Sequence, residues 1–311
     1  MESSRPTDLD EVVGQTDLVL RLRVVMGGAR ARGTKAPHVL LSGPPGTGKT
    51  TLARIVAHEL GLPLTTATGP GLRRVGDLAG VLTGLPHEGA VLFIDEIHRL
   101  PSVVEESLYE ALEDGSLSVT VGSGSDARAV TLPLSPVVVV GATTKPGAVS
   151  APLRDRFGFH ATMAPYSEDE LAAIVEREWR RLGATFEPEA PYVVATRAKG
   201  VPRRALHLAQ RVLDVAAIMR RDVTPELAER ALETFGIGEQ GLDETDWAIL
   251  RALCVTFAGR AVGLDALAQA LDLDVATIER EHEGPLVRAG YLVRTRTGRM
   301  ATPDAYALVR A

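Results

Sequence analysis

The chain is poor in cysteine and has no long apolar run. Its one cysteine, Cys254, excludes an internal disulfide framework and any zinc site built from several cysteines. No apolar run reaches the roughly 18 residues of a membrane span, and residues 1–6 lack the apolar core of a signal peptide. We therefore expect a cytoplasmic protein that folds in a reducing environment and has no membrane partner.

The chain also lacks an excess of positive charge. Its net charge is −6, and lysine occurs only at positions 35, 49, 145 and 199. A generally basic nucleic-acid binder is thereby excluded, so any DNA contact must be local or must line one face of an assembly. With 311 residues, 45% of them hydrophobic, the chain is long and apolar enough for two or three globular domains.

Residues 43–51 read GPPGTGKTT and match the pattern G-x-x-x-x-G-K-[ST]. They lie between a short apolar run and an amphipathic segment, which is the strand–loop–helix setting that the pattern requires. Gly46 and Gly48 allow the backbone to wrap closely round phosphate groups. Lys49 would reach the β- and γ-phosphates, and the hydroxyl of Thr50 would ligate Mg²⁺. The stretch predicts a nucleoside triphosphate site rather than an ordinary Gly/Pro turn.

Apolar runs alternate with helical segments on both sides of this loop. The runs at 91–94 and 136–140 are continuous, as in strands that are buried on both faces. This alternation predicts a parallel sheet covered by helices on both faces, with its ligands at the carboxyl ends of the strands. Residues 117–121 and 129–132 alternate instead around a Gly/Ser-rich turn. They predict a β-hairpin, which either projects from the domain for a partner or is an ordinary surface hairpin.

Polar residues follow both continuous runs. Asp95 can hold Mg²⁺ through a water, and Glu96 beside it can polarise the attacking water. The alternative is a strand that leads into a capped helix. Thr144, or its neighbour Thr143, can orient the water or sense the γ-phosphate. His98 has no second ligand at metal spacing, so we expect a structural or coupling role.

Two arginines outside these runs are candidates for contact with the phosphates. Arg156 lies in the segment Arg154-Asp155-Arg156, where the chain re-enters the sheet. A guanidinium donated from there to a neighbouring subunit would stabilise charge on the transferring phosphoryl group, which requires an oligomer, for which we expect a ring. Arg203 opens a helix of the second domain and can touch the phosphates from a lid. Hydrolysis would then change the angle between the first two domains.

The rest of the chain predicts two further domains. Residues 166–236 are helical throughout, and Thr224-Pro225-Glu226 has the pattern of a helix start. Residues 242–311 predict three helices, at about 243–257, 264–271 and 275–289, and then a short hairpin, as in a winged helix. Acidic residues outnumber arginines there, but residues 288–299 contain four arginines and no acid. This tract favours phosphate contact by the wing, with protein contact as the alternative.

Together the motifs resemble those of the RuvB family, the Holliday-junction branch-migration ATPases of the AAA+ class, from Arg5 to the C-terminus. The resemblance is carried by Arg5-Pro6 before Val13-Gly14-Gln15, by Gly43-Pro44-Pro45-Gly46, Phe93-Ile94-Asp95-Glu96-Ile97-His98-Arg99-Leu100, Gly141-Ala142-Thr143-Thr144 and Pro152-Leu153-Arg154-Asp155-Arg156-Phe157-Gly158, and by Gly241-Leu242-Asp243, Val262-Gly263-Leu264, Arg294-Thr295 and Gly298-Arg299.

The resemblance implies an α/β AAA+ P-loop domain with a parallel sheet (1–165), a small all-helical lid domain (166–236) and a C-terminal winged-helix DNA-binding domain (242–311). It implies an ATPase that uses ATP and Mg²⁺, forms a homo-hexamer round double-stranded DNA and drives that DNA through Holliday junctions in recombination and repair. RuvA would dock on the 117–132 hairpin, with RuvC as a further partner.

The resemblance also implies roles for individual residues. The catalytic residues would be Asp95, Glu96, Thr144 and Arg156, with Arg156 acting on the neighbouring subunit. The residues that bind ATP or ADP would be Arg5, Gly46, Gly48, Lys49, Thr50, Thr51, Glu113, Asp114, Tyr166 and Arg203; Thr50 and Asp95 would hold the metal, and Arg294 and Arg299 would contact DNA phosphates.

Several positions depart from the family pattern. The family usually has Leu where this chain has Thr47, and an aromatic residue where it has Gly115. The hairpin residues Val119, Val121 and Val130 are smaller than the residues that the family usually has there. Residues 283–286 and 296–297 also differ, so a divergent or paralogous member is a second possibility.

Two other functions compete with the motor. One is an AAA+ assembly or loading factor that uses ATP as a conformational switch without processive translocation. Clamp loaders of that kind carry a helical collar in place of a winged helix. The other is a transcriptional activator, whose own hairpin signature we do not find.

Overall fold

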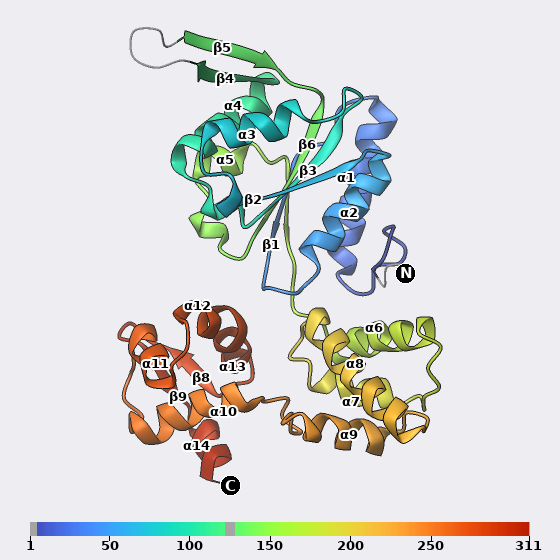
Figure 1. The fold of residues 1–311 in the computed structure, drawn as a ribbon, viewed down its shortest axis with the longest axis vertical. Helices are drawn as coiled ribbons and strands as arrows, with labels where there is room; N and C mark the ends of the chain where they lie inside the picture. Colours follow the sequence, from blue (N-terminus) through green and yellow to red (C-terminus); the bar gives the residue numbers. More distant parts are fainter. Residues whose placement is uncertain (1–4, 122–127, 311) are drawn as a thin grey trace. The chain divides into compact units, whose positions relative to one another are not determined.

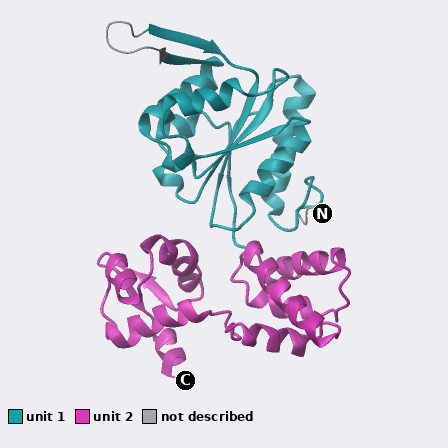
Figure 2. Cartoon of the chain, in the orientation of Figure 1, with its two compact units in different colours: residues 1–165 teal, residues 166–311 magenta. Residues whose placement is uncertain are grey.

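The computed structural model describes residues 5–121 and 128–310. They form two compact units, residues 1–165 and residues 166–311 (Figure 2). Within the described residues, no helix combines the length and the apolar character that crossing a bilayer requires.

The first unit is built on a five-stranded parallel sheet in the order β2-β3-β6-β1-β7 (Figure 1). Its strands are β1 (Val39–Ser42), β2 (Leu64–Thr68), β3 (Ala90–Asp95), β6 (Val137–Thr143) and β7 (Phe159–Thr162), and its α-helices are α1 (Thr16–Arg32), α2 (Lys49–Leu60), α3 (Val75–Thr83), α4 (Ser102–Asp114) and α5 (Ala151–Asp155). Short 3₁₀ turns are η1 (Gly69–Gly71), η2 (Ile97–Arg99) and η4 (Pro146–Ala148).

Two hydrophobic cores enclose this sheet. Helices α1 and α2 pack on one face, for example through Leu22 and Ile55, and α3, α4 and α5 pack on the other, for example through Leu78 and Leu108. All four residues of β1 are buried, as expected for a strand covered on both sides. The predicted parallel sheet with helices on both faces is therefore confirmed.

Strand β6 continues past the apolar run at 136–140 and ends at Thr143. The predicted threonine pair therefore lies at the tip of this strand. A Cβ at Gly141 would lie 2.9 Å from Ile97 and 3.0 Å from Phe157. The glycine there allows close packing within the strand and does not end it.

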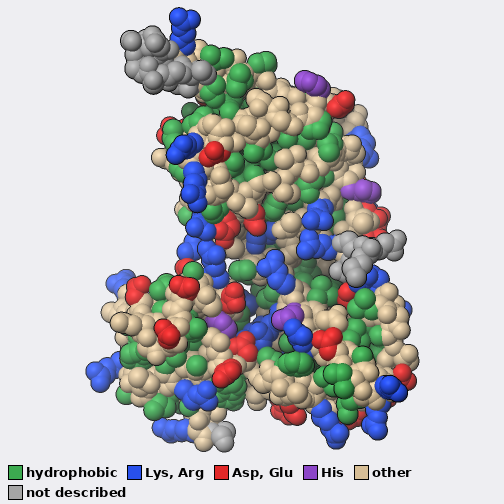
Figure 3. All heavy atoms as spheres, viewed as in Figure 1, with side chains coloured by type: hydrophobic (Ala, Val, Ile, Leu, Met, Phe, Trp, Pro, Cys, Tyr) green, Lys and Arg blue, Asp and Glu red, His purple; other side chains and the backbone are tan. Residues whose placement is uncertain are grey.

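The predicted hairpin is present as β4 (Ser116–Val121) and β5 (Arg128–Pro133), paired antiparallel from Ser116 opposite Pro133 to Val121 opposite Arg128. It forms its own two-stranded sheet, separate from the parallel one (Figure 1). Residues 122–127 of the predicted turn lie outside the described residues. Val130 is 40% exposed, and hydrophobic side chains are visible over the hairpin in Figure 3.

The second unit begins with a helical bundle of α6 (Glu168–Arg181), α7 (Ala190–Thr196), α8 (Pro202–Met219) and α9 (Pro225–Thr234). Trp179 is fully buried in it and donates from Nε1 to the carbonyl oxygen of Ala209 at 3.2 Å. Thr224 caps α9 by accepting from the backbone N–H of Leu227, with Pro225 as the first helical residue. The predicted start of this helix is thus confirmed.

The remainder of the second unit contains the three predicted helical segments and the wing. The elements are α10 (Glu244–Arg251) continued by the π-helical η5 (Ala252–Thr256), α11 (Leu264–Leu271), α12 (Val275–Thr277) continued by the π-helical η6 (Ile278–Glu283) and α13 (Gly284–Arg288), and the strands β8 (Leu292–Arg294) and β9 (Arg299–Ala301). A last helix, α14 (Pro303–Arg310), was not expected from the sequence.

Candidate nucleotide site and DNA interface

Three neighbouring strands bring the predicted site residues to one edge of the sheet. The P-loop follows β1, the tandem acids end β3, and the threonines end β6. Ser42 of β1 is in register with Thr143 of β6, and the N–H of Gly43 donates to the carbonyl oxygen of Thr143 at 3.2 Å. The sheet therefore joins the loop directly to the threonine pair.

The P-loop has the backbone that the pattern requires. Gly43, Gly46 and Gly48 have φ values of 143°, 76° and 104°, a region that residues with a Cβ rarely adopt. A Cβ on Gly43 would lie 2.6 Å from the carbonyl oxygen of Met163. Thr47 is buried and donates from Oγ1 to the carbonyl oxygen of Pro44 at 2.9 Å. This departure from the family pattern therefore stabilises the loop turn.

Lys49 is the first residue of α2, and it is 8% exposed. Its Nζ donates to the carbonyl oxygens of Gly43 and Pro44, both at 2.8 Å, so the ammonium lies over the loop. The N-cap residue of this 12-residue helix is Gly48, which has no side chain with which to cap it. Its first N–H groups are suited to phosphate oxygens, and the half-buried Thr50 and Thr51 belong to the same first turn. These residues fit a nucleotide polyphosphate.

The tandem acids have different surroundings. Asp95 is half-buried and accepts from the N–H of Glu96 through Oδ1 at 3.0 Å, and with Thr50 it offers the oxygen ligands that Mg²⁺ prefers. Glu96 has a left-handed backbone, with φ of 50° and ψ of 44°, which is uncommon outside glycine and clusters at functional sites. Its Oε2 pairs with Arg99 at 3.0 Å.

The two threonines differ in their burial and in their hydrogen bonds. Thr143 is 1% exposed, its Oγ1 is 2.9 Å from Nδ1 of His98, and it accepts from the N–H of Lys145. Thr144 is half-buried. The structure thus favours Thr144 for contact with water or phosphate, while His98 links the end of β3 to the end of β6 in a structural role.

Arg156 and Glu113 lie together, although the sequence placed them in separate roles. Arg156 follows α5, and its guanidinium is 2.5 Å from Oε2 of Glu113 near the end of α4. It also lies over the ring of Tyr109, 5.6 Å from the centroid. Asp114 is exposed beside them, and Gly115, with φ of 64°, ends α4. A glycine is favoured at this helix end, which accounts for the missing aromatic residue.

The remaining predicted nucleotide contacts lie at three other positions. Arg5 is exposed before α1. Tyr166 begins the second unit, where its N–H donates to the carbonyl oxygen of Gly200, and burial raises the pKa of its hydroxyl to about 12. Arg203 is the exposed second residue of α8. Their contact with nucleotide remains a prediction.

The wing arginines have an acidic neighbour that their own tract lacks. Arg294 and Arg299 both donate from Nε to Oε1 of Glu283, at 2.9 and 2.7 Å, and Glu283 is 1% exposed. Burial would raise the pKa of Glu283, but the two guanidiniums hold it below its ordinary value. Residues 288–299 contain no acid, but the preceding helical segment supplies one in space.

Charges of both signs are interspersed over the visible face of the second unit (Figure 3). The side chain of Arg294 remains 57% exposed and that of Arg299 24% exposed. The carboxylate engages only Nε in these bonds, so it fixes the direction of each guanidinium. Contact with DNA phosphate remains a prediction for both.

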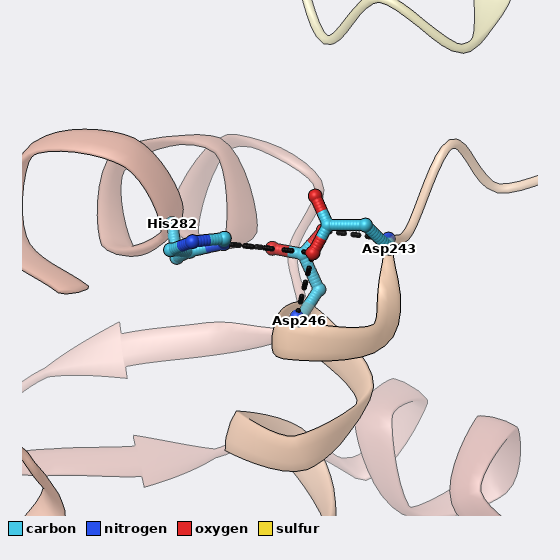
Figure 4. Close-up of side chains that lie close together, drawn as sticks. All are labelled: Asp243, Asp246 and His282. Carbon is cyan, nitrogen blue, oxygen red and sulfur yellow. Dashed lines mark hydrogen bonds and ion pairs between the residues drawn. The ribbon is translucent and has the colours of Figure 1, made fainter. Parts of the chain in front are cut away.

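One cluster was missed entirely. Asp243, Asp246 and His282 lie together in the second unit (Figure 4), and the ammonium of Lys199 bonds to Asp246. Asp243 and Asp246 form a capping box at the start of α10, a pattern that was legible in the sequence. The contact with Lys199, which is 47 residues away, had no local signal.

Comparison with known proteins places the three parts of the chain in one family. The family model described as "Holliday junction DNA helicase RuvB P-loop domain" matches residues 4–163, the RuvB AAA lid domain matches 166–238, and the RuvB C-terminal winged helix domain matches 239–310.

Curated relatives and a solved structure point to the same family. The Holliday junction branch migration complex subunit RuvB of Thermobifida fusca is 48% identical over 97% of this chain and 86% of its own, and that of Nocardioides sp. is 46% identical over 97% and 84%. The structure of the Thermotoga maritima RuvB Holliday junction branch migration motor is 39% identical, with a TM-score of 0.89, over 99% of this chain and 98% of that one. The AAA+, lid and winged-helix fold is thereby confirmed, and the loading factor is not favoured.

Proposed function

The chain belongs to the RuvB family of Holliday-junction branch-migration ATPases, and from this we propose that it is an ATP-driven motor that moves double-stranded DNA through Holliday junctions in recombination and repair. The observation that carries the proposal is one chain that joins the P-loop site at the edge of the sheet to a helical lid and a winged helix. Such a motor would act in the cytoplasm, where a bacterial chromosome lies.

ATP hydrolysis would use the residues at the carboxyl ends of β1, β3 and β6. The P-loop N–H groups and Lys49 would hold the phosphates, and Thr50 and Asp95 would hold Mg²⁺, which neutralises charge on the phosphate oxygens when bound. Glu96 would orient a water for attack on the γ-phosphorus and accept its proton, giving ADP and phosphate. Thr144 would hold that water from the neighbouring strand.

Glu96 has to exchange Arg99 for water before it can do this. The side chain of Arg99 is 48% exposed and that of Glu96 is 24% exposed. Exposed ion pairs of this kind stabilise a protein by only about 0–1 kcal/mol. The pair therefore presents only a small barrier to this exchange.

The active site would be shared between subunits of a homo-hexamer. Arg156 would be donated to the neighbour's γ-phosphate, and Glu113 and Tyr109 would hold its guanidinium in position until then. Because Glu113 lies with Arg156, we assign Glu113 and Asp114 to this donated edge. Arg5, Tyr166 and Arg203 would complete the nucleotide site, with Arg203 reporting the state of the phosphates to the lid.

Partners would bind at the two hairpins. The β4–β5 hairpin, with its exposed Val130, would dock on RuvA through apolar contacts, and RuvC would join the same complex. Arg294 and Arg299 on the wing would contact DNA phosphates without reading sequence.

Branch migration of a synthetic four-way junction tests the proposal. We expect the purified chain to convert the junction into duplex products only with ATP and Mg²⁺, and more efficiently when RuvA is added. Lys49→Ala is the matched inactive control. Conversion that is independent of ATP, or absent with and without RuvA, would reject the motor. ATP-dependent assembly on DNA without junction movement would instead support the loading factor.

A further inference from the structure

A group of buried charges joins two parts of the second unit that the family models treat as separate domains. Lys199 and Arg204 belong to the lid segment, and Asp243, Asp246 and His282 belong to the winged-helix segment. The side chains of Asp246, His282 and Lys199 are only 0%, 9% and 10% exposed. Charges this deeply buried are costly to leave unpaired, so their pairing constrains both segments.

The pairing is dense. The ammonium of Lys199 bonds to Oδ2 of Asp246 and lies 3.6 Å from Oδ2 of Asp243. Arg204 donates to Oδ2 of Asp243 and to the carbonyl oxygen of Gly241, both at 2.9 Å. His282 approaches the other oxygen of Asp246 through Nδ1 at 2.8 Å, as Figure 4 shows. Each lid cation thus contacts a carboxylate of the winged helix.

The geometry alone would also suggest a metal site. The ligand atoms of Asp243, Asp246 and His282 lie within 4.8 Å of one another. Lys199, however, already supplies a cation between the two carboxylates. Burial would raise the pKa of Asp243, but Lys199, the backbone N–H of Asp246 and Arg204 together hold it well below its usual range. In the part of the chain that the structure describes, no buried side-chain polar atom lacks a hydrogen bond. A metal would have to displace the lysine.

Backbone contacts hold the same interface from both sides. Gly241 has φ of 66°, and a Cβ there would lie 2.8 Å from the carbonyl oxygen of Arg197. Arg288 of α13 donates to the carbonyl oxygen of Lys199 at 3.2 Å. Lys199 itself has a left-handed backbone, with φ of 56°, so it occupies a restrained position.

We infer that Lys199 and Arg204, bound to Asp246 and Asp243, form a rigid joint that makes the lid and the winged helix move as one body. The effect of this joint on DNA movement rests on the proposed function. Arg203, the predicted phosphate contact, lies between the two cations of the joint in sequence. A change at the phosphates that moves Arg203 would therefore also move Lys199 and Arg204, and with them the winged helix. No flexible linker would then separate the nucleotide from the DNA.

Lys199→Met in the full-length chain tests the joint. Because Lys199 lies outside the P-loop and the wing, we expect nucleotide binding, ATPase rate and DNA affinity to stay within about threefold of the parent. The branch-migration rate per ATP hydrolysed should fall by about tenfold or more, because hydrolysis no longer moves the winged helix as one body with the lid. Lys199→Arg keeps the charge and should retain most of the coupling. Arg180→Met, which removes an exposed pair with Glu176 in the same unit, is the matched control.

Three results would overturn the inference. One is a Lys199→Met variant whose migration per ATP stays within about twofold of the parent. The second is calorimetry in which the parent's lid and winged helix unfold in separate transitions; the joint predicts one transition in the parent and two in the variant. The third is a fall in that transition temperature when EDTA is added to nucleotide-free parent, which would identify a metal as the cation.

Two further arrangements keep the test decisive. If Lys199→Met does not fold, the double variant Lys199→Met with Asp246→Asn leaves no unpaired charge at that contact and replaces it in every measurement. If the parent itself moves no junction, the proposed function fails, while calorimetry still decides on the joint.

Discussion

Replacing Arg156 with alanine should separate a large catalytic effect from a small structural one. The side chains of Arg156 and Glu113 are 39% and 48% exposed. Exposed ion pairs and cation–π contacts each stabilise a protein by about 0–1 kcal/mol. The free energy of unfolding should therefore fall by about 1 kcal/mol, whereas a guanidinium donated to a phosphoryl group accelerates hydrolysis by roughly 10³-fold or more, about 4 kcal/mol in the barrier.

The assay combines steady-state ATPase at saturating ATP with thermal unfolding of the same preparations. Arg23→Ala removes another exposed arginine that pairs with a carboxylate in the first unit, and it should leave the ATPase rate unchanged. An Arg156→Ala variant that keeps more than about a tenth of the parent rate would refute the catalytic role.

Mixing subunits tests whether Arg156 acts on the neighbour. Arg156→Ala and Glu96→Ala subunits are each inactive alone, but about a quarter of the interfaces in a random equimolar ring pair an intact Glu96 with an intact neighbouring Arg156. ATPase activity should therefore recover in part. No recovery at any mixing ratio, once fluorescence has shown subunit exchange, would contradict donation to the neighbour.

Three other variants probe the P-loop and the wing. Lys49→Ala should abolish nucleotide binding, measured with a fluorescent ATP analogue, or turnover, measured by phosphate release. Normal turnover in this variant would contradict the assignment of the P-loop as the nucleotide site. Arg294→Ala with Arg299→Ala should weaken DNA affinity equally for all sequences and lower the salt slope by about one per lost phosphate contact; an unchanged slope would point to a protein partner. Glu283→Gln should cost about 1–3 kcal/mol of unfolding free energy at pH 7 in urea titrations, because the two guanidiniums would then bond to a neutral amide oxygen in place of a carboxylate. The folded-state pKa of Glu283 lies below its unfolded value. Its contribution to the free energy of unfolding is therefore present above about pH 4.3 and is lost as the pH falls. A difference in unfolding free energy between parent and variant that persists in acid would contradict this.

Residues that act through local spacing could be predicted from the sequence. The P-loop, the Asp95-Glu96 pair and the threonine pair each follow a continuous apolar run, and parallel strands bring such ends to one edge. The choice between Thr143 and Thr144 needed the structure, because it depends on the hydrogen bond to His98.

Contacts between residues far apart in the sequence could not be predicted. Glu283 contacts Arg294 and Arg299 because the fold packs the end of η6 against the strands β8 and β9 of the wing. Lys199 meets Asp246 across two domains, and Arg156 meets Glu113 across two helices. Each pair joins ordinary charged residues whose sequence neighbours give no sign of a partner.

The most direct test of the motor is the time course of junction migration as the homologous arms are lengthened. With saturating ATP, RuvA and Mg²⁺, a processive motor should show a lag before product appears, and this lag should grow in proportion to arm length. Lys49→Ala should give only spontaneous migration. A lag that does not depend on arm length, with product no faster than in the Lys49→Ala reaction, would contradict ATP-driven translocation by this chain.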